Sequence, residues 1–423
     1  MIKILLLFIV VFLNAITIQD VLEAVKLSPQ TKIDNILIDN IKISKKEIKN
    51  SLFPKIYLIS SYTHYSIPTA IRPLPPTQSV QLLKTNSSLP FSKNIARIGF
   101  GVDMPLFVKE IYENKKRVSM LLESIKLKSK LSLIQREALV IGYISNLNYL
   151  FDLKNALLEQ KKSIKTTLNS IKVGVENGTI PRFKMLRLKD KLNEIDIKID
   201  SIYSQINSIK SNIYSLTKLK INKPIRFNIL PLQTKSFFTI KILKNNLLVS
   251  KQEVRVKESS FYPEVFLKIN ANRSFAKSYN TDKSIALNYA SIGVYLKWNI
   301  FNKKNRSLIE KAKINVLKNS LEIEKVKAEL YAKSQKIKQN LKLINNSISK
   351  VKKSIELKKE LLQDAKVAFS MNRMSVDEYL GYEDMLNFEK SNLSRLIALR
   401  NSYLANLAVI YGIDIERICR WKK

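Results

Sequence analysis

Cysteine, histidine, glycine and acidic side chains are all scarce in this chain. Its 423 residues include 8 Gly, one Cys, at Cys419, and one His, at His64. A single thiol forms no disulfide within one chain, and Cys419 lies too late in the sequence to carry a lipoprotein-type acyl anchor. One Cys and one His so far apart provide neither a metal cluster nor a Cys/His nucleophile pair. Ser/Lys or paired-carboxylate catalysis is formally open, but no residues are spaced to suggest either. We therefore expect a protein that is not an enzyme and has no cofactor or metal site.

The shortage of acidic residues leaves a large positive charge. The chain has 73 Lys plus Arg against 35 Asp plus Glu, a formal net charge of +38. Such a charge suits the neutralisation of nucleic-acid phosphates, but it also arises when the solvated faces of helices are simply rich in lysine. Because the sequence contains no recognisable nucleic-acid-binding module, solvated helix faces are the favoured interpretation.

The N-terminus predicts export from the cytoplasm. The segment MIKILLLFIVVFLNA has one Lys, an apolar run from Ile4 to Leu13, and a small residue at Ala15. The run is too short to cross a bilayer, and this order of features is typical of a secretory signal peptide. We predict a signal peptide over residues 1–15, with an uncleaved anchor as the alternative. An exported chain would not meet cytosolic DNA, so we expect no nucleic-acid partner.

Three segments of the first half are echoed in the second half. The pairs are SLFPKIYLISS from Ser51 and SFYPEVFLKIN from Ser260, IGFGVDMPLF from Ile98 and IGVYLKWNIF from Ile292, and VGVENGTIPRFKML from Val173 and VAFSMNRMSVDEYL from Val367. Because the echoes keep one order along the chain, they predict an internal duplication. We predict a first structural repeat over residues 16–220, a linker over 221–236 and a second repeat over 237–423.

Each repeat is predicted to begin with a helix, at 18–50 and 238–259, and to continue into a β-hairpin. In residues 292–300, apolar side chains at even positions alternate with Gly, Tyr, Lys and Asn at odd positions. This period of two is typical of a half-buried strand, either in a soluble sandwich or, at about ten residues, in a transmembrane barrel. The predicted hairpins occupy residues 55–105 and 263–300. Five prolines between Pro68 and Pro90 predict a long loop without regular structure in the first hairpin.

After each hairpin the apolar spacing changes to steps of three and four. Apolar residues follow these steps through 192–216 and 337–355, and no proline occurs from Leu106 to Ile180 or after Ile300. This pattern is typical of coiled-coil helices, which we predict over 107–219 and 302–413. Each range needs one turn. Pro181 is placed for the first turn of the returning helix in the first repeat, and Ser375 and Glu378 have the spacing of a capping box in the second.

Four short strands are too few to close a barrel, for which about eight is the minimum. Open strand edges within lipid would leave backbone groups without hydrogen bonds. A membrane location for these strands would therefore require several chains to share one barrel. The predicted fold class is mainly α with a small β part, in which a helix, a β-hairpin and long antiparallel coiled-coil helices occur twice.

In this arrangement the chain resembles the TolC family of outer-membrane efflux proteins. The residues that carry the resemblance are TIQDVLEAVKLSP after the signal, the strand starts at Pro54 and Pro263, the strand-to-helix passages at Gly99 and Gly293, and the tip segments at Gly178 and Asn372. The resemblance covers essentially the whole mature chain, and it depends on the duplicated order more than on any single motif. It implies a homotrimer whose strands form a 12-stranded barrel in outer-membrane lipid, continued by an α-helical tunnel in the periplasm.

The family resemblance also implies a function. Such proteins are passive, gated exit ducts for efflux or secretion, and they work with a periplasmic adaptor protein and an inner-membrane transporter. Coiled coils at the far periplasmic end close like an iris. The alternative is an exported coiled-coil structural or surface-binding protein without a pore, which would need no lipid-facing alternation in its strands. The sequence indicates neither the cargo nor the class of transporter.

Family members often carry carboxylates at the closed end of the tunnel. Counting from Asn372, Glu378 falls on the first acidic position, and Gly381 falls on the second, where the acid is absent. The gate candidates are Glu378, its neighbours Asp377 and Asp384, and Arg182 and Lys184 in the corresponding basic stretch of the first repeat. The residues expected to contact the adaptor are those of the two tips: Gly178, Thr179, Pro181, Asn372, Arg373 and Ser375. We expect an entrance friendlier to anionic cargo; alternatively, Glu378 is a capping residue and the basic residues are solvated.

Overall fold

The computed structural model describes residues 16–85, 87–232, 236–371 and 373–421, so the predicted signal peptide lies outside the described residues. The chain divides into two units, and each unit takes segments from both predicted repeats. The first unit comprises Met1–Ile36, Lys126–Leu243 and Ile323–Lys423, and the second comprises Leu37–Ile125 and Lys244–Glu322. The predicted repeat boundaries describe the order of elements along the chain, whereas these units describe which segments pack together.

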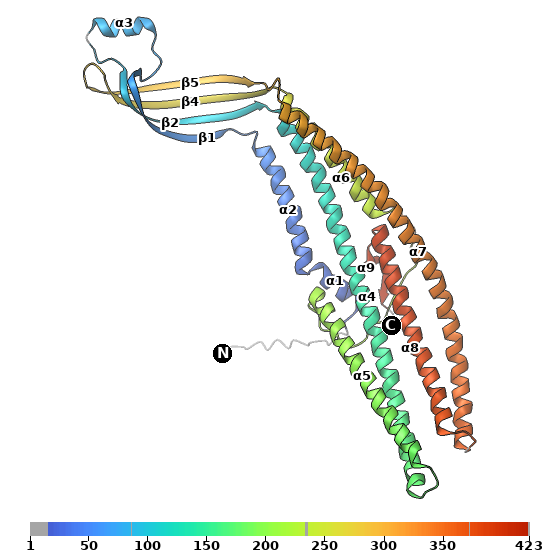
Figure 1. Cartoon of the computed structure of the whole chain (residues 1–423). Coiled ribbons are helices and arrows are strands. Elements are labelled where there is room, and N and C mark those ends of the chain that lie inside the picture. Colours follow the sequence, from blue (N-terminus) through green and yellow to red (C-terminus); the bar gives the residue numbers. More distant parts are fainter. Residues whose placement is uncertain (1–15, 86, 233–235, 372, 422–423) are drawn as a thin grey trace, which may run out of the picture. The chain divides into compact units, whose positions relative to one another are not determined.

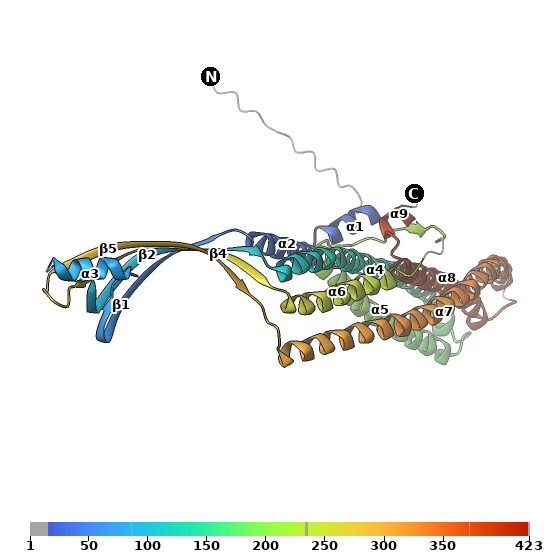
Figure 2. The same cartoon turned by 90° about the horizontal axis from the view of Figure 1, so that it is seen from above.

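The second unit contains a four-stranded antiparallel sheet. Its strands are β1 (Lys55–Ala70), β2 (Phe91–Phe107), β4 (Glu264–Lys277) and β5 (Ser284–Lys297), in the order β1-β2-β4-β5. Figure 1 shows the strands side by side, and Figure 2 shows the same sheet turned by 90°. Pairing of β2 with β4 joins the two predicted hairpins, whereas β1 and β5 lie at the edges and pair with no further strand in the described chain.

Two of the expectations for the hairpins are wrong. The interval of five prolines is not a loop without regular structure, because β1 continues through Pro68 to Ala70 and a helix, α3, occupies Pro76–Lys84. Proline is tolerated in β1 because the pairing register shifts between His64 and Thr69, around Pro68. It is tolerated in α3 because Pro76 opens the helix, where its missing N–H loses no hydrogen bond. The strands, at 14 to 17 residues, are also longer than the expected ten or so.

The two faces of the sheet differ in polarity over much of their area. The pairing registers place aligned rows across the four strands: Leu58, Phe100, Ala271 and Ala290 in one row, and Ile56, Val102, Ile269 and Ile292 in the next. The opposite face carries rows such as Tyr57, Gly101, Asn270 and Ser291. The apolar side chains are not buried within the chain, since Ile292 is 72% exposed and Phe100 is 62% exposed. This face of the sheet is therefore mainly apolar and uncovered, although its row of Ser60, Ile98, Arg273 and Asn288 is largely polar.

Gly99 is a point where β2 and β4 depend on the absence of a side chain. A Cβ built at Gly99 would lie 2.4 Å from the Ala271 carbonyl oxygen and 2.5 Å from the Asn272 Cβ. We expect Gly99→Val to destabilise the sheet by about 3 kcal/mol, because the clash involves backbone that cannot move aside. The β signal in circular dichroism should be lost at a lower temperature. Gly381→Ala is the control, since nothing lies within 4 Å of its added Cβ. Equal melting of the two variants would contradict this account.

The helices before the hairpins are α1 (Ile18–Lys26), α2 (Pro29–Asn50) and α6 (Phe238–Glu258), with a short 3-10 turn, η1, at Ser259–Phe261. The single helix expected over 18–50 is thus two helices. α1 begins with a capping box in which Thr17 and Asp20 bond each other's backbone N–H. The break falls before Pro29, which cannot continue a hydrogen-bonded helix from the preceding turn.

The long helices follow the hairpins in the expected order. α4 (Lys109–Glu176) and α7 (Lys303–Ser370) are each 68 residues long, and α5 (Arg182–Thr217) and α8 (Val376–Tyr411) are each 36 residues long. The α5 residues at the predicted seam, from Ile195 to Ile213, are buried at steps of three and four. No helix in the described segments combines the length and apolar character that a bilayer crossing requires.

The core of the first unit contains elements that the sequence analysis did not anticipate. Within the predicted linker, β3 (Phe227–Ile229) pairs antiparallel with β6 (Cys419–Trp421), which follows the short helix α9 (Ile415–Ile418). β3 and Cys419 pack with buried residues of α1, α4, α5 and α8 in one apolar cluster. The buried Asn148 amide fixes the linker to α4, because it donates to the Ile225 carbonyl at 2.7 Å and accepts from the Ile225 N–H at 2.9 Å.

Candidate functional site

The turn between α4 and α5 is closed by its own backbone. Gly178 has φ +73°, a conformation that side chains disfavour. The N–H groups of Thr179 and Ile180 donate to the Gly174 carbonyl at 2.8 and 3.0 Å, and so satisfy the end of α4. Pro181 is the N-cap of α5, one position before the first turn where the sequence analysis placed it. This tip therefore presents an exposed loop held by hydrogen bonds of its own backbone.

The turn between α7 and α8 contains the predicted capping box, which is confirmed. The Ser375 Oγ accepts from the Glu378 N–H at 3.3 Å, and the Ser375 N–H donates to the Glu378 carboxylate at 2.9 Å. The Ser375 N–H, together with the Ser375 hydroxyl, which donates to the same carboxylate at 2.8 Å, holds the pKa of Glu378 below its usual value. Arg373 closes the end of α7 through its N–H, which donates to the Ala368 carbonyl at 2.9 Å. Asn372 lies outside the described residues.

The other two acidic gate candidates link α8 to neighbouring helices. The Arg187 guanidinium of α5 lies 3.2 Å from the Asp377 carboxylate. Asp384, two turns further along α8, lies 2.7 Å from the Lys191 ammonium of α5 and also accepts a hydrogen bond from Gln160 of α4. Asp384 is therefore the residue at which α4, α5 and α8 are joined by polar contacts.

An apolar contact lies beside these polar ones. Leu380 of α8 is 1% exposed and packs in one cluster with buried Ile164 and Ile171 of α4 and with Leu188 and Ile195 of α5. Apolar packing of this kind supplies most of the association energy, because partly exposed ion pairs contribute only about 1 kcal/mol or less. The ion pairs therefore set which helix faces meet, whereas Leu380 holds them together.

α7 and α8 are joined near their turn by an aromatic pair. The rings of Phe369 and Tyr379 stack with centroids 5.0 Å apart. The Tyr379 hydroxyl donates to the Glu383 carboxylate at 2.8 Å, and burial together with this carboxylate raises the pKa of Tyr379 to about 12. Tyr379 is therefore neutral at physiological pH and acts as a packed hydrogen-bond donor.

The basic gate candidates are placed differently from the acidic ones. Arg182 and Lys184 lie exposed in the first turn of α5, and within the described part of the chain their side chains form no ion pair. Asp377 and Asp384 instead pair with Arg187 and Lys191. The sequence analysis did not propose Lys191 or Gln160. Lys191 precedes the seam residue Leu192, a flanking position where charges often link coiled-coil helices, but this signal does not identify the partner helix.

No cluster of three or more potential metal-ligating side chains occurs in the described parts of the chain. The site therefore consists of two helical turns and the polar and apolar contacts that hold α8 against α4 and α5. Such contacts can break and re-form without any covalent reaction, because each is a non-covalent contact between helices.

Comparison with known proteins gives different results for sequence and for structure. No protein-family profile matches the sequence, and no curated protein matches it. The structure is similar to the Campylobacter jejuni CmeC outer membrane channel, with 14% identity, a TM-score of 0.75, and coverage of 94% of this chain and 86% of that one. It is also similar to the outer membrane protein VceC from Vibrio cholerae, with 11% identity, a TM-score of 0.72, and coverage of 94% and 95%. The Neisseria gonorrhoeae MtrE outer membrane channel in its open state gives 11% identity, a TM-score of 0.73, and coverage of 93% and 88%.

This chain has the fold of these outer-membrane proteins. At such identities the similarity establishes the fold, and it extends over nearly the whole of each chain. The predicted resemblance is thereby confirmed at the level of architecture, with a mainly helical chain and a small antiparallel sheet.

Proposed function

We propose that this chain is a subunit of an outer-membrane channel that provides a passive, gated exit duct for efflux or secretion. The observation that carries the proposal is the sheet of β1, β2, β4 and β5, whose apolar face is exposed and whose polar face is opposite. A soluble chain would normally cover such a face, whereas lipid on one side and water on the other suit it without a cover.

The edges of the sheet support an oligomer. β1 and β5 each have one side without a partner strand in the described chain. Within lipid, unpaired N–H and C=O groups cost several kcal/mol each, so β5 of one copy must pair with β1 of the next. Three copies of four strands would give the 12-stranded barrel expected from the family resemblance. We therefore propose a homotrimer in outer-membrane lipid.

The helical part of the proposal is a periplasmic tunnel. The repeats 16–220 and 237–423 would each contribute one pair of long helices, and the turns at Gly178 and Ser375 would meet a periplasmic adaptor. The adaptor would in turn connect to an inner-membrane transporter. In this proposal the links from Asp377 and Asp384 to α5 are broken when the tunnel opens. No catalytic step and no cofactor are part of the proposed function.

The first test is membrane fractionation combined with amine-reactive cross-linking, for which the lysine-rich chain offers many sites. We expect the full chain to be recovered in the outer membrane and to cross-link as a trimer. A variant without residues 1–15 should remain in the cytoplasm and should give no trimer. Recovery of the full chain as a soluble periplasmic monomer would overturn the proposal and would favour a structural coiled-coil protein without a pore.

A further inference from the structure

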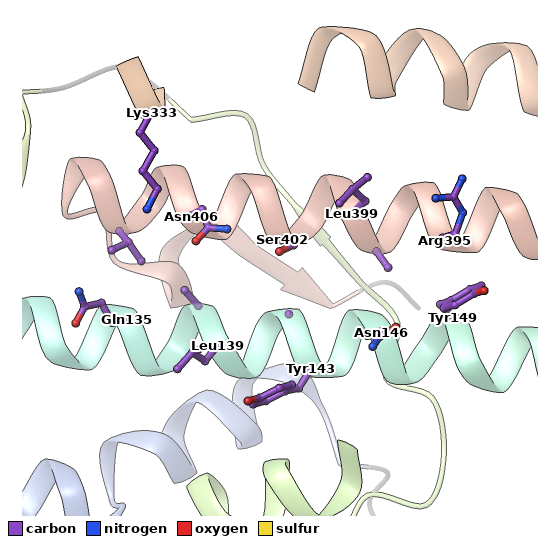
Figure 3. A pocket seen from close by; sticks show the side chains of 14 residues that line it. Gln135, Leu139, Tyr143, Asn146, Tyr149, Lys333, Arg395, Leu399, Ser402 and Asn406 are labelled. Carbon is purple, nitrogen blue, oxygen red and sulfur yellow. The ribbon is translucent and has the colours of Figure 1, made fainter. Parts of the chain in front are cut away.

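A groove lies between α4 and α8 in the first unit and carries no assigned role. Its volume is about 730 Å³, and Lys333 of α7 adds to its lining. Figure 3 shows α4 and α8 running alongside each other, with the side chains that line the groove drawn on both helices. Pockets of about 300 to 1,000 Å³ are typical of sites for small organic molecules. The groove is therefore large enough for a ligand of that size.

The groove is on the face of α4 that points away from the core. Leu139 lines the groove and is 53% exposed, whereas its neighbours Val140 and Ile141 are fully buried in the core. The space exists because small residues line it: Ala138 and Gly142 on α4, and Ala398 on α8. A Cβ added at Gly142 would meet no atom within 4 Å, so the groove is open directly above this residue.

The charges that line the groove are all positive. Arg395 of α8 and Lys333 of α7 are its charged residues, and no carboxylate lines it. The Arg395 guanidinium donates to Asn392 at 3.0 Å, and the Lys333 ammonium forms no ion pair with any described residue. Figure 3 shows Lys333 at the end of the groove near Asn406 and Arg395 at the end near Tyr149. Each end therefore offers a cation with free hydrogen-bond donors.

Between the two cations the lining is apolar with a few polar groups. Leu139 and Leu399, which is 38% exposed, present aliphatic surface on opposite helices. Asn146, Ser402 and Asn406 add amide and hydroxyl groups that can donate or accept hydrogen bonds. A positive group beside apolar surface favours a ligand that combines an anionic group with an apolar body.

We propose that this groove binds small amphipathic organic anions. The apolar body lies along Leu139 and Leu399 above Gly142, and the carboxylate, sulfate or sulfonate group is held by Arg395 or Lys333. An organic cation of the same shape is repelled by both charged residues, and a neutral molecule gains no ionic contact. As a statement about cargo the inference rests on the proposed channel function, whereas binding itself is a property of the folded chain.

Binding is measured on the full chain purified into amphipol, with naphthalene-1-sulfonate as the probe and its fluorescence anisotropy as the readout. The matched probe 1-naphthylmethylammonium has the same ring system with the opposite charge. We expect the dissociation constant of the sulfonate to be at least tenfold lower than that of the ammonium. Equal affinity for the two probes would overturn the inference.

Variants locate the site. Gly142→Trp fills the groove and is expected to weaken sulfonate binding at least tenfold. Arg395→Gln combined with Lys333→Gln removes the charges without filling the space, and it is expected to abolish the preference for the sulfonate. The control is Lys352→Gln, an exposed lysine of α7 that lies outside the groove. Because both double-variant residues lie on the surface of their helices, this variant remains informative even if Gly142→Trp fails to fold. Unchanged binding in the double variant would also overturn the inference.

Conductance in planar bilayers separates this inference from the proposed function. If the chain forms pores but binds the two probes equally, the proposed channel function stands and the proposed anion site in the groove is wrong. If the chain binds the sulfonate through Arg395 and Lys333 but forms no pore, the proposed anion site stands and the proposed channel function is wrong.

Discussion

Asp384→Ala is expected to raise the open probability of the proposed channel by about a hundredfold. The carboxylate joins α8 to Lys191 of α5 at 2.7 Å and to Gln160 of α4, and the Lys191 and Asp384 side chains are each about one-third exposed. A partly exposed pair of this kind contributes about 1 kcal/mol. In the proposed trimer three copies contribute about 3 kcal/mol to the closed state, which corresponds to about a hundredfold in the equilibrium between closed and open. Single-channel recording in planar bilayers measures the open probability of the wild type and of the variant.

Two further variants make this prediction specific. Lys191→Ala removes the partner on α5 and is expected to act in the same direction, and the double variant should open little more than either single variant. Asp190→Ala is the control, because Asp190 is exposed on α5 and forms no ion pair with any described residue. Wild-type gating in both Asp384→Ala and Lys191→Ala would show that this contact does not hold the closed state.

Glu378 illustrates why sequence position alone did not identify the contact at Asp384. Glu378 stands at the position that the family resemblance marks as acidic, yet its carboxylate bonds the Ser375 N–H and Oγ within its own helix. This geometry favours the alternative that Glu378 is a capping residue. The local spacing of Ser375 and Glu378 predicts a cap because both groups belong to one helical turn. The partners of Asp384, by contrast, come from α4 and α5, and no local rule specifies which distant side chains meet.

The same distinction between local and distant contacts explains the rest of the fold. The change of apolar period from two to steps of three and four located the hairpins and the long helices, because each pattern depends on neighbours within a few residues. β3 and β6 were missed because each is only three residues long and their pairing joins the linker to the C-terminus. The course of β1 through Pro68 was missed because proline disfavours a paired strand, and only the register shift in the observed ladder accommodates it.

Glu137 is the residue that should give the first unit its strongest dependence on pH. It is fully buried on α4, and neither carboxylate oxygen has a hydrogen-bond partner of normal geometry among the described residues. Burial raises the pKa of Glu137 to about 7; nearby Asp414 and Glu416 act in the same direction, while Lys26 and the Ile415 N–H oppose them. The Lys26 ammonium is itself paired with Glu416, so it compensates Glu137 only in part.

The raised pKa of Glu137 determines the direction in which the free energy of unfolding changes with pH. A carboxyl group that is easier to protonate in the folded chain stabilises the fold below its unfolded pKa, and this contribution is lost as the pH rises through the folded value. The shift from 4.5 to about 7 corresponds to about 3 kcal/mol. The wild-type free energy of unfolding should therefore fall by about 3 kcal/mol between about pH 4.5 and about pH 8 through this group alone.

Glu137→Gln is expected to remove that fall, because the amide keeps the shape of the side chain and does not ionise. At about pH 8 the variant should be more stable than the wild type by up to about 3 kcal/mol, and at about pH 4.5 the two should be similar. Urea unfolding, followed by the helical signal in circular dichroism, measures the free energy of unfolding of the wild type and of the variant at each pH. The control is Glu360→Gln, an exposed carboxylate of α7, which should keep the wild-type slope.

The reactivity of the Cys419 thiol provides a second test of the titration of Glu137. Burial, with a smaller contribution from the Glu137 charge, raises the pKa of the Cys419 thiol to about 12, so the native thiol should react slowly with maleimide. Ionisation of Glu137 destabilises the packing around β6, so local opening should accelerate the labelling of Cys419 as the pH rises from about 4.5 to about 7 in the wild type but not in Glu137→Gln. If the variant shows the same acceleration and the same loss of stability as the wild type, Glu137 is not the group that titrates. If both are abolished, its buried carboxylate couples pH to the attachment of the C-terminal segment.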